Sequence, residues 1–123
     1  MVRIDINEQI VWIELPGILG IREIEAAVDQ LLDHPDHIDG MDEIWDFRHT
    51  NFVNIGAEQL RSFAVFVASR LDRLANRVVY VPGRDLEYGI VRMWEAYAEE
   101  KAPQERKILH DIDAAREWLL ARR

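Results

Sequence analysis

Apolar and polar residues alternate over 2–6, and a period of two is typical of a half-buried strand. Residues 9–15 predict a second strand. Asn7 and Glu8 stand between these segments, so we expect the two strands to pair as a hairpin. Shorter apolar-rich segments predict three further strands, at 42–48, 76–81 and 105–110.

Other segments repeat their apolar residues every three or four positions, which predicts amphipathic helices. These helices are expected at 21–33, at 57–73, at 85–100 and after Asp111. His34 precedes a proline and therefore ends the first helix, because such a residue is pushed out of helical conformation. Asp85 and Asp111 are placed to cap the last two helices.

The resulting order of elements is β-β-α-β-α-β-α-β-α. Strands that alternate with helices predict a mostly parallel sheet, to which the first hairpin adds an antiparallel pair. We therefore expect an α/β fold with a mixed sheet of about five strands and about four helices. Residues 1–123 are enough for one such domain and too few for two ordinary ones.

The 85–100 helix has two distinct sides. Its apolar stripe is expected to face the core and consists of Leu86, Ile90, Met93, Trp94 and Tyr97. The opposite side carries Tyr88, Arg92, Glu95 and Glu99. Gly89 lies between these sides, where glycine costs about 1 kcal/mol relative to alanine. We expect a close approach to compensate, first by a packing neighbour, or else by a second subunit or a ligand.

Composition narrows the functional classes. The net charge is −8, which disfavours nucleic acid and anionic membrane surfaces as partners. The chain has no cysteine, so disulfides and thiolate metal sites are excluded. The first residues lack the apolar core of a signal peptide, and the apolar run 64–68 is too short for a membrane span. These features predict a cytoplasmic protein.

A group of polar residues follows the strand at 42–48, in the stretch WDFRHTNFVNIG. In parallel sheets, ligands favour the carboxyl ends of strands, and a helix N-terminus favours anions. Arg48 is placed to hold an anionic group, with Asp46 orienting Arg48 or His49. Tyr88 and Arg92, near the start of the 85–100 helix, complete this candidate site. The alternative is that Asp46 and Arg48 satisfy loop groups and one another.

The segment D-F-R-H-T-N-F-V-N-I-G-A (46–57) resembles a motif of the STAS domains of bacterial anti-sigma-factor antagonists, D-F-S-H-V-D-F-x-D-S-S-G. The resemblance implies a STAS-like fold. In the antagonists, phosphorylation of the first serine of the pair releases a kinase partner. Here Ile55 and Gly56 stand at the serine positions, and neither can accept a phosphoryl group. The resemblance therefore implies the fold without the switch.

The rest of the chain is similar to the small bacterial STAS/Sec14-like proteins. Their pattern combines a D-[LF]-R strand end, a Y-G-x-x-R-M helix and a terminal D-x-x-x-A-x-x-W-L helix. The matching positions here are 46–48, 88–93 and the set Asp111, Ala115, Trp118 and Leu119. The Sec14 resemblance implies an apolar or lipid-like ligand.

The 57–73 helix is apolar around more than one face. Phe66 falls about 120° from Leu60 on a helix of 3.6 residues per turn. In the antagonists that the chain resembles, this helix forms much of the partner surface. The candidate interface is Phe63, Phe66 and Arg70, with Gly89, and it would serve a homodimer or a docked regulator.

Metal and catalytic chemistry have little support in the sequence. His34 and His37 lie near Asp36, Asp39 and Asp42, but the intervening proline disrupts their alignment, so a solvated acidic loop is expected. No catalytic motif is present, and His49 lacks an obvious nucleophile partner. We therefore expect a non-enzymatic module, without cofactor, that binds a small anionic or amphipathic lipid-like ligand. A protein-interaction module is the alternative, and an enzyme ranks last.

Overall fold

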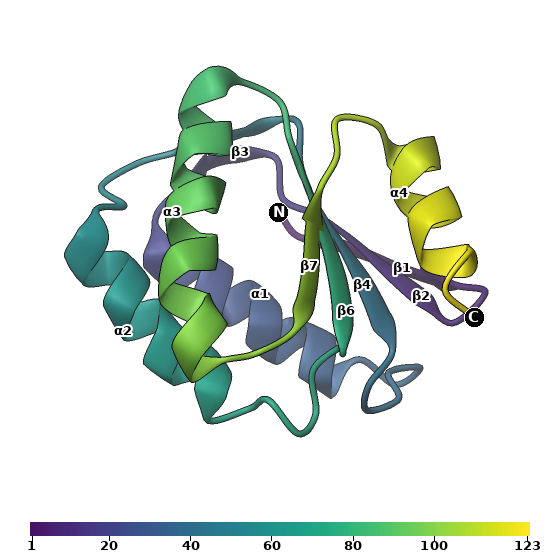
Figure 1. The fold of residues 1–123 in the computed structure, drawn as a ribbon. Helices are drawn as coiled ribbons and strands as arrows, with labels where there is room; N and C mark the ends of the chain where they lie inside the picture. The colour runs from purple at the N-terminus through teal and green to yellow at the C-terminus, as the bar shows by residue number, and fades with distance from the viewer.

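A computed structural model describes all of residues 1–123 (Figure 1). The helices are α1 (Ile21–Asp33), α2 (Ala57–Ala68), α3 (Asp85–Lys101) and α4 (Ile112–Leu120). The strands are β1 (Arg3–Asn7), β2 (Ile10–Glu14), β3 (Gly17–Leu19), β4 (Asp42–Phe47), β5 (Thr50–Phe52), β6 (Arg77–Pro82) and β7 (Glu105–Ile108). The predicted α/β order is confirmed, with β3 and β5 as additions.

Five strands form the main sheet in the order β1-β2-β4-β6-β7. The β1–β2 pair is antiparallel and the other three pairs are parallel, as predicted. Glu8 and Gln9 join β1 to β2, and both have positive φ, 55° and 61°. Two such residues make the tight turn whose twist matches that of a hairpin.

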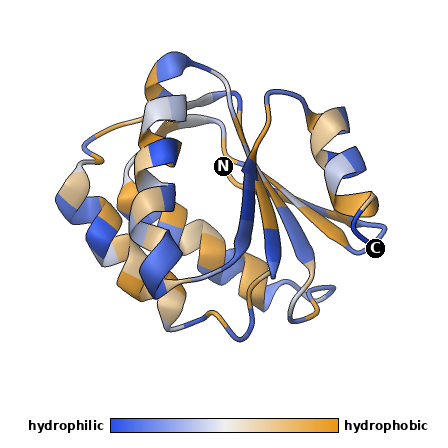
Figure 2. Cartoon of the chain, in the orientation of Figure 1, coloured by the Kyte–Doolittle hydropathy of each residue, from blue (hydrophilic) through white to orange (hydrophobic).

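The sheet is covered unequally on its two faces. Helices α1, α2 and α3 lie on one face, and α4 alone lies on the other (Figure 1). Alternation along β4 directs Trp45 and Phe47 into the larger core beneath the three helices. Ile44 points the other way and packs with Ala115 and Leu119 of α4. The edge strand β7 is largely hydrophilic (Figure 2).

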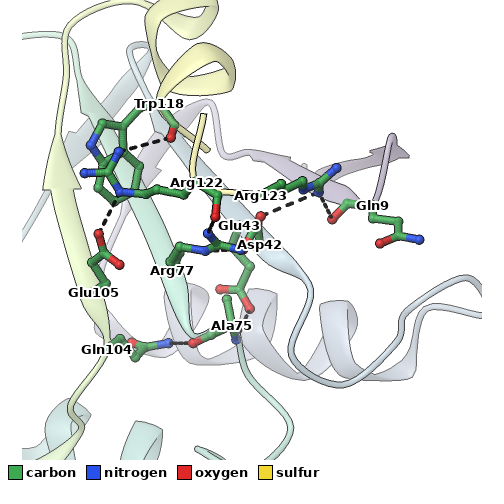
Figure 3. A network of polar contacts seen from close by, with 10 residues as sticks. All are labelled: Gln9, Asp42, Glu43, Ala75, Arg77, Gln104, Glu105, Trp118, Arg122 and Arg123. Atoms are coloured by element: carbon green, nitrogen blue, oxygen red, sulfur yellow. Dashed lines mark hydrogen bonds and ion pairs between the residues drawn. The ribbon is translucent and has the colours of Figure 1, made fainter. Parts of the chain in front are cut away.

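Ion pairs fasten the end of α4 to the sheet (Figure 3). The guanidinium of Arg77 donates from Nε to Asp42 Oδ1 over 3.2 Å and from Nη1 to the Arg122 carbonyl over 2.8 Å. Arg122 Nε donates to Glu105 Oε1 over 2.7 Å, and Arg123 Nη2 lies 3.5 Å from Asp42 Oδ2. Asp42 is therefore a buried carboxylate that is neutralised by two arginines.

The sequence did not predict two short strands. Strands β3 and β5 pair in parallel, with Gly17 opposite Thr50 and Leu19 opposite Phe52. The Thr50 hydroxyl also donates to the Leu15 carbonyl. A three-residue strand is too short to show a period of two. This small sheet holds the segment that follows β4 against the segment that precedes α1.

The second helix is shorter than predicted. It ends at Ala68 rather than at 73, and the chain continues through turns. The Ser69 hydroxyl donates to the Phe66 carbonyl over 2.7 Å, and the Arg70 guanidinium donates to the same carbonyl over 3.1 Å. These side chains satisfy one of the carbonyls left without a partner at a helix end.

The predicted core stripe of α3 is right only in part: Trp94 is buried and Ile90 and Tyr97 pack against the core, but Leu86 and Met93 do not. The buried residues of this helix are Glu87, Val91, Trp94 and Ala98. Leu86 is 59% exposed and Met93 is 41% exposed. The buried face of α3 includes the charged Glu87, whereas the prediction assumed that the face with the most apolar residues is buried. The expected packing neighbour of Gly89 is also absent, since a Cβ added there would meet no atom within 4 Å.

None of the helices is both long and apolar enough to cross a membrane.

Candidate functional site

An apolar cavity of about 60 Å³ lies between the sheet and helices α1–α3. Of the 18 residues that line it, 16 are hydrophobic. The sheet contributes Trp45 and Tyr80, while the helices contribute Phe63, Val67 and Trp94. Among them, the rings of Phe63 and Trp94 pack against each other with 4.9 Å between their centroids.

An open hollow of about 520 Å³ lies outside this cavity, between the segment after β5 and the first turns of α3. Phe52, Ile55 and Ile90 line both spaces. Phe52 is buried, and Ile55 and Ile90 are half-buried. These three side chains therefore lie between the cavity and the hollow, and we call them the outer wall.

The cavity wall includes a buried carboxyl group, that of Glu43, which is 2% exposed. Its Oε1 accepts from Trp45 Nε1 over 2.9 Å, and its Oε2 accepts from the Ala75 backbone N–H over 3.0 Å. Burial raises the pKa of Glu43 to about 7, against the opposing effect of these two donors. Asp42 adds a smaller upward shift to this pKa.

Tyr80 lies one strand away on the same wall. Its phenol oxygen accepts from Trp94 Nε1 over 2.9 Å. Burial raises the pKa of Tyr80, while the positive charge of Arg106 lowers it in part. Arg106 extends from β7, and its Nε is buried without a hydrogen-bond partner. Glu43 and Tyr80 therefore give the mostly apolar cavity wall two polar groups, with Arg106 behind them outside the lining.

Arg48 binds Asp46. The guanidinium donates from Nε to Oδ1 over 2.9 Å and from Nη2 to Oδ2 over 2.9 Å. The Arg48 backbone N–H and Trp12 Nε1 donate to the same carboxylate, each over 3.1 Å. Burial alone would raise the pKa of Asp46, but these hydrogen bonds bring it below its ordinary value. The sequence allowed Arg48 either to hold an anionic ligand or to pair with Asp46. In the structure it pairs with Asp46.

The remaining candidates from the sequence lie near the same edge of the sheet. The Tyr88 ring packs at a tilt against His110, with 5.8 Å between the ring centroids, and both residues line a hollow of about 240 Å³. Arg92 Nη1 donates to the Tyr88 hydroxyl over 3.3 Å, and His49 is exposed.

A close backbone contact joins these parts of the edge. A Cβ on Gly83 would come within 2.2 Å of the Arg48 carbonyl oxygen, so Gly83 lies directly against Arg48. Gly83 also lines the hollow that contains Tyr88. The structure therefore brings Arg48 and Tyr88 to the same edge, with Arg92 one turn further along α3. None of Asp46, Arg48, His49, Tyr88 and Arg92 lines the apolar cavity.

Sequence reasoning missed Glu87, whose side chain is fully buried. Arg84 donates to both of its carboxylate oxygens, over 2.7 and 2.8 Å, and the Phe52 backbone N–H donates to it over 3.1 Å. The hydrogen bonds from Arg84 lower the pKa of Glu87. The one sequence signal is an arginine three residues before a glutamate at a helix start, which is also common on exposed helices. Through its hydrogen bond with the Phe52 N–H, Glu87 connects the outer wall to α3.

The proposed interface residues divide between core and surface. Phe63 faces the core, where it is 9% exposed. Phe66 is half-buried beneath Arg70, whose guanidinium carbon lies 3.6 Å from the ring centroid. Arg70 Nε also donates to Asp29 over 3.0 Å. Gly89 is exposed on α3.

The histidines of the loop after α1 have local partners. His34 Nδ1 accepts from the Asp36 backbone N–H over 3.1 Å, and His37 Nδ1 lies 3.8 Å from Asp39 Oδ1. No group of three histidine or acidic side chains is arranged to hold a metal ion.

No family model matches the chain, and no curated protein matches it. Among solved structures, it is similar to an uncharacterized protein of the DUF3478 family from Shewanella loihica PV-4, which is described as having a SpoIIAA-like fold. The TM-score is 0.60 at 14% sequence identity, over 97% of this chain and 92% of that chain. The likeness confirms the STAS-like fold that the sequence motifs predicted.

Proposed function

We propose that this SpoIIAA-like chain is a non-enzymatic binding module for a small amphipathic molecule, whose apolar part occupies the cavity beneath α1–α3. The observation that carries the proposal is the cavity itself, about 60 Å³ lined mostly by hydrophobic side chains. A space of roughly 10–15 Å³ is enough for one water molecule, and apolar cavities bind small apolar molecules. Protein interiors are normally densely packed, so an unfilled space of this size is a candidate ligand site.

Access to the cavity is expected through the outer wall. Phe52, Ile55 and Ile90 lie between the cavity and the open hollow, since they line both spaces. A molecule larger than a few heavy atoms requires these side chains to move into the hollow. The space outside, about 520 Å³, is large enough to accept them.

An amphipathic ligand is favoured over an anionic one held by Arg48. The Arg48 guanidinium is already bound by Asp46 through two hydrogen bonds. Glu14 and Asp111 lie close enough to raise the pKa of Arg48 further. An incoming anion would therefore compete with a bound carboxylate in a region of negative charge.

Titration of the chain with 1-hexanol, followed by ¹⁵N NMR, tests the proposal. We expect saturable shifts of amides around the cavity. Val67→Ile adds one carbon to the cavity wall and is expected to weaken binding severalfold. Val65→Ile makes the same change on the same helix, where Val65 is 59% exposed, and should leave binding unchanged. Non-saturable shifts, or equal effects of the two variants, would reject the cavity as the site.

Self-association through α2, or docking of a protein partner there, is the second candidate. Val65 is exposed and Phe66 beside it is half-buried, so the outer side of this helix carries apolar surface. Sedimentation at micromolar concentration tests the homodimer directly. A dimer that Val65→Glu converts to a monomer supports it, and a monomeric wild type rejects it.

A further inference from the structure

The two residues of the cavity wall that are not hydrophobic, Glu43 and Gln104, lie at one end of it. Ala75 connects them, since its N–H donates to Glu43 and its carbonyl accepts from Gln104 Nε2 over 2.6 Å (Figure 3). Figure 3 shows both side chains directed toward Ala75, below the ion pairs of Asp42. Buried polar groups in an apolar wall are costly and require hydrogen-bond partners.

Register places Tyr80 beside this end of the cavity. Trp45 of β4 is opposite Tyr80 of β6, and Glu43 is opposite Val78. Glu43 and Tyr80 are therefore diagonal neighbours on one face of adjacent strands, and both line the cavity. Arg106 of β7 is opposite Val78 from the other side. One face of three adjacent strands thus gathers an acid, a phenol and a guanidinium.

These groups have hydrogen-bonding capacity that the chain does not use. Each Glu43 oxygen accepts one N–H, although a carboxylate oxygen can accept two. The Tyr80 oxygen accepts from Trp94, and its own hydrogen has no acceptor in the chain. Arg106 Nε is also buried without a partner, but Arg106 does not line the cavity. A ligand group in this end of the cavity would therefore meet an acceptor in Glu43 and a donor in Tyr80.

We infer that this polar end, which we call the Glu43–Tyr80 floor, selects an uncharged apolar alcohol. The hydroxyl group would donate to Glu43 and accept from Tyr80, while the hydrocarbon part lies against the aromatic wall. The inference rests on the proposed function and specifies the ligand class for the same cavity. A hydroxyl is the smallest group that both donates and accepts.

Charged alternatives fit the floor less well. A carboxylate ligand would bring a second acid beside Glu43. A protonated amine could donate to Glu43 but offers no lone pair to the Tyr80 hydrogen. An ether accepts but cannot donate, so it would leave the Glu43 capacity unused. Only the alcohol both donates to Glu43 and accepts from Tyr80.

Two probes of equal heavy-atom count separate this inference from the proposed function. They are 1-hexanol, which donates and accepts, and 1-methoxypentane, which only accepts. Burial of a hydroxyl without partners is unfavourable, so an apolar cavity without a specific floor would prefer the ether. We expect the wild type to prefer 1-hexanol by about tenfold, the effect of one or two hydrogen bonds.

Tyr80→Phe removes the donor with little change of shape, and Glu43→Gln changes the acceptor. Glu43→Gln is expected to lower the alcohol-to-ether ratio of affinities toward one while leaving affinity for the ether within about twofold, because only the alcohol donates to Glu43. Tyr80→Phe is expected to weaken both probes severalfold, because both accept from the Tyr80 hydroxyl. Unfolding curves show whether a variant folds. If Glu43→Gln does not fold, the wild-type ratio and Tyr80→Phe decide the matter.

The outcomes are distinct. If both probes bind the wild type equally, or if hexanoate binds more tightly than 1-hexanol, the alcohol inference is overturned and the cavity proposal stands. Affinities for the two probes that Tyr80→Phe leaves unchanged also overturn the inference. If neither probe binds, the proposed function itself fails.

Discussion

Arg48 lies against Asp46 in a two-point ion pair, with both donor-to-acceptor distances equal to 2.9 Å. The Asp46 side chain is fully buried, whereas the Arg48 side chain is 36% exposed. Removal of one partner from a buried pair leaves an uncompensated charge, and that loss is usually larger than the net contribution of the pair.

We therefore expect Arg48→Ala to lower the free energy of unfolding by about 2 kcal/mol, less than for a fully buried pair because water screens the exposed side. Urea unfolding measures this change. Arg92→Ala is the control, since the Arg92 side chain is 62% exposed and pairs only with Glu95 and Tyr88 on the same helix. Equal effects of the two variants would contradict a stabilising role for the Asp46 pair.

Glu87→Ala is expected to destabilise the chain by roughly 2 kcal/mol. The change leaves the Phe52 N–H without its acceptor and Arg84 without its partner, and a buried unsatisfied donor costs about 1–3 kcal/mol. Glu95→Ala on the same helix removes only an exposed pair with Arg92 and should change stability by less than about 0.5 kcal/mol. A small effect of Glu87→Ala in the same unfolding assay would show that this carboxylate is dispensable.

The raised pKa of Glu43 predicts a pH dependence of stability. Its value is about 7 in the folded chain against an ordinary 4.5, so the folded chain binds more protons between these values. The favourable contribution is complete below pH 4.5 and is lost as pH rises through 7, by roughly 3 kcal/mol in total.

Glu43→Gln isolates this contribution. The lowered pKa of His37 gives the opposite slope, because stability from that group is lost as pH falls below its ordinary 6.5. Wild type and Glu43→Gln share the His37 contribution, so it cancels in the difference between their free energies of unfolding. We expect wild type to lose stability relative to the variant from pH 5 to pH 8. A constant difference would show that Glu43 does not titrate in this window.

Two glycines should respond to alanine in opposite ways. Gly83→Ala would place a Cβ 2.2 Å from the Arg48 carbonyl oxygen, a rigid backbone atom, so we expect a loss of more than about 2 kcal/mol. Gly89→Ala meets no atom within 4 Å in the interior of α3, so we expect a gain of about 0.5–1 kcal/mol. Thermal unfolding of both variants measures the contrast. A destabilised Gly89→Ala would point to an additional neighbour, such as a second subunit.

The main sheet and the four helices could be predicted because each element is long enough to show its period. Strands β3 and β5 could not, since each has three residues and depends on pairing with the other. The face of α3 was misassigned by one position, which is about 100° of rotation, because Glu87 is buried. Charge alone did not reveal that an arginine and a backbone N–H stabilise it there.

The candidate site was predictable only in part. The Asp46–Arg48 pair was one of two arrangements that the strand end allowed, because the residues are two positions apart on one face. The cavity could not be predicted, since its volume depends on how side chains from the sheet and three helices fit together. Glu43 gave a weak signal, as an acid within an interior strand, but its partner Ala75 is distant in sequence.

Under the proposed function, the hydrogen bond from the Phe52 N–H to Glu87 bears on the rate of ligand exchange. Phe52 belongs to the outer wall, and its N–H is held by a carboxylate of α3. Any opening that carries β5 away from α3 must break this bond, so the bond slows release without contributing to contacts with the ligand. Protonation of Glu87, at pH values below its ordinary 4.5, weakens the bond. Residence time should therefore shorten in acid even for a ligand that carries no charge.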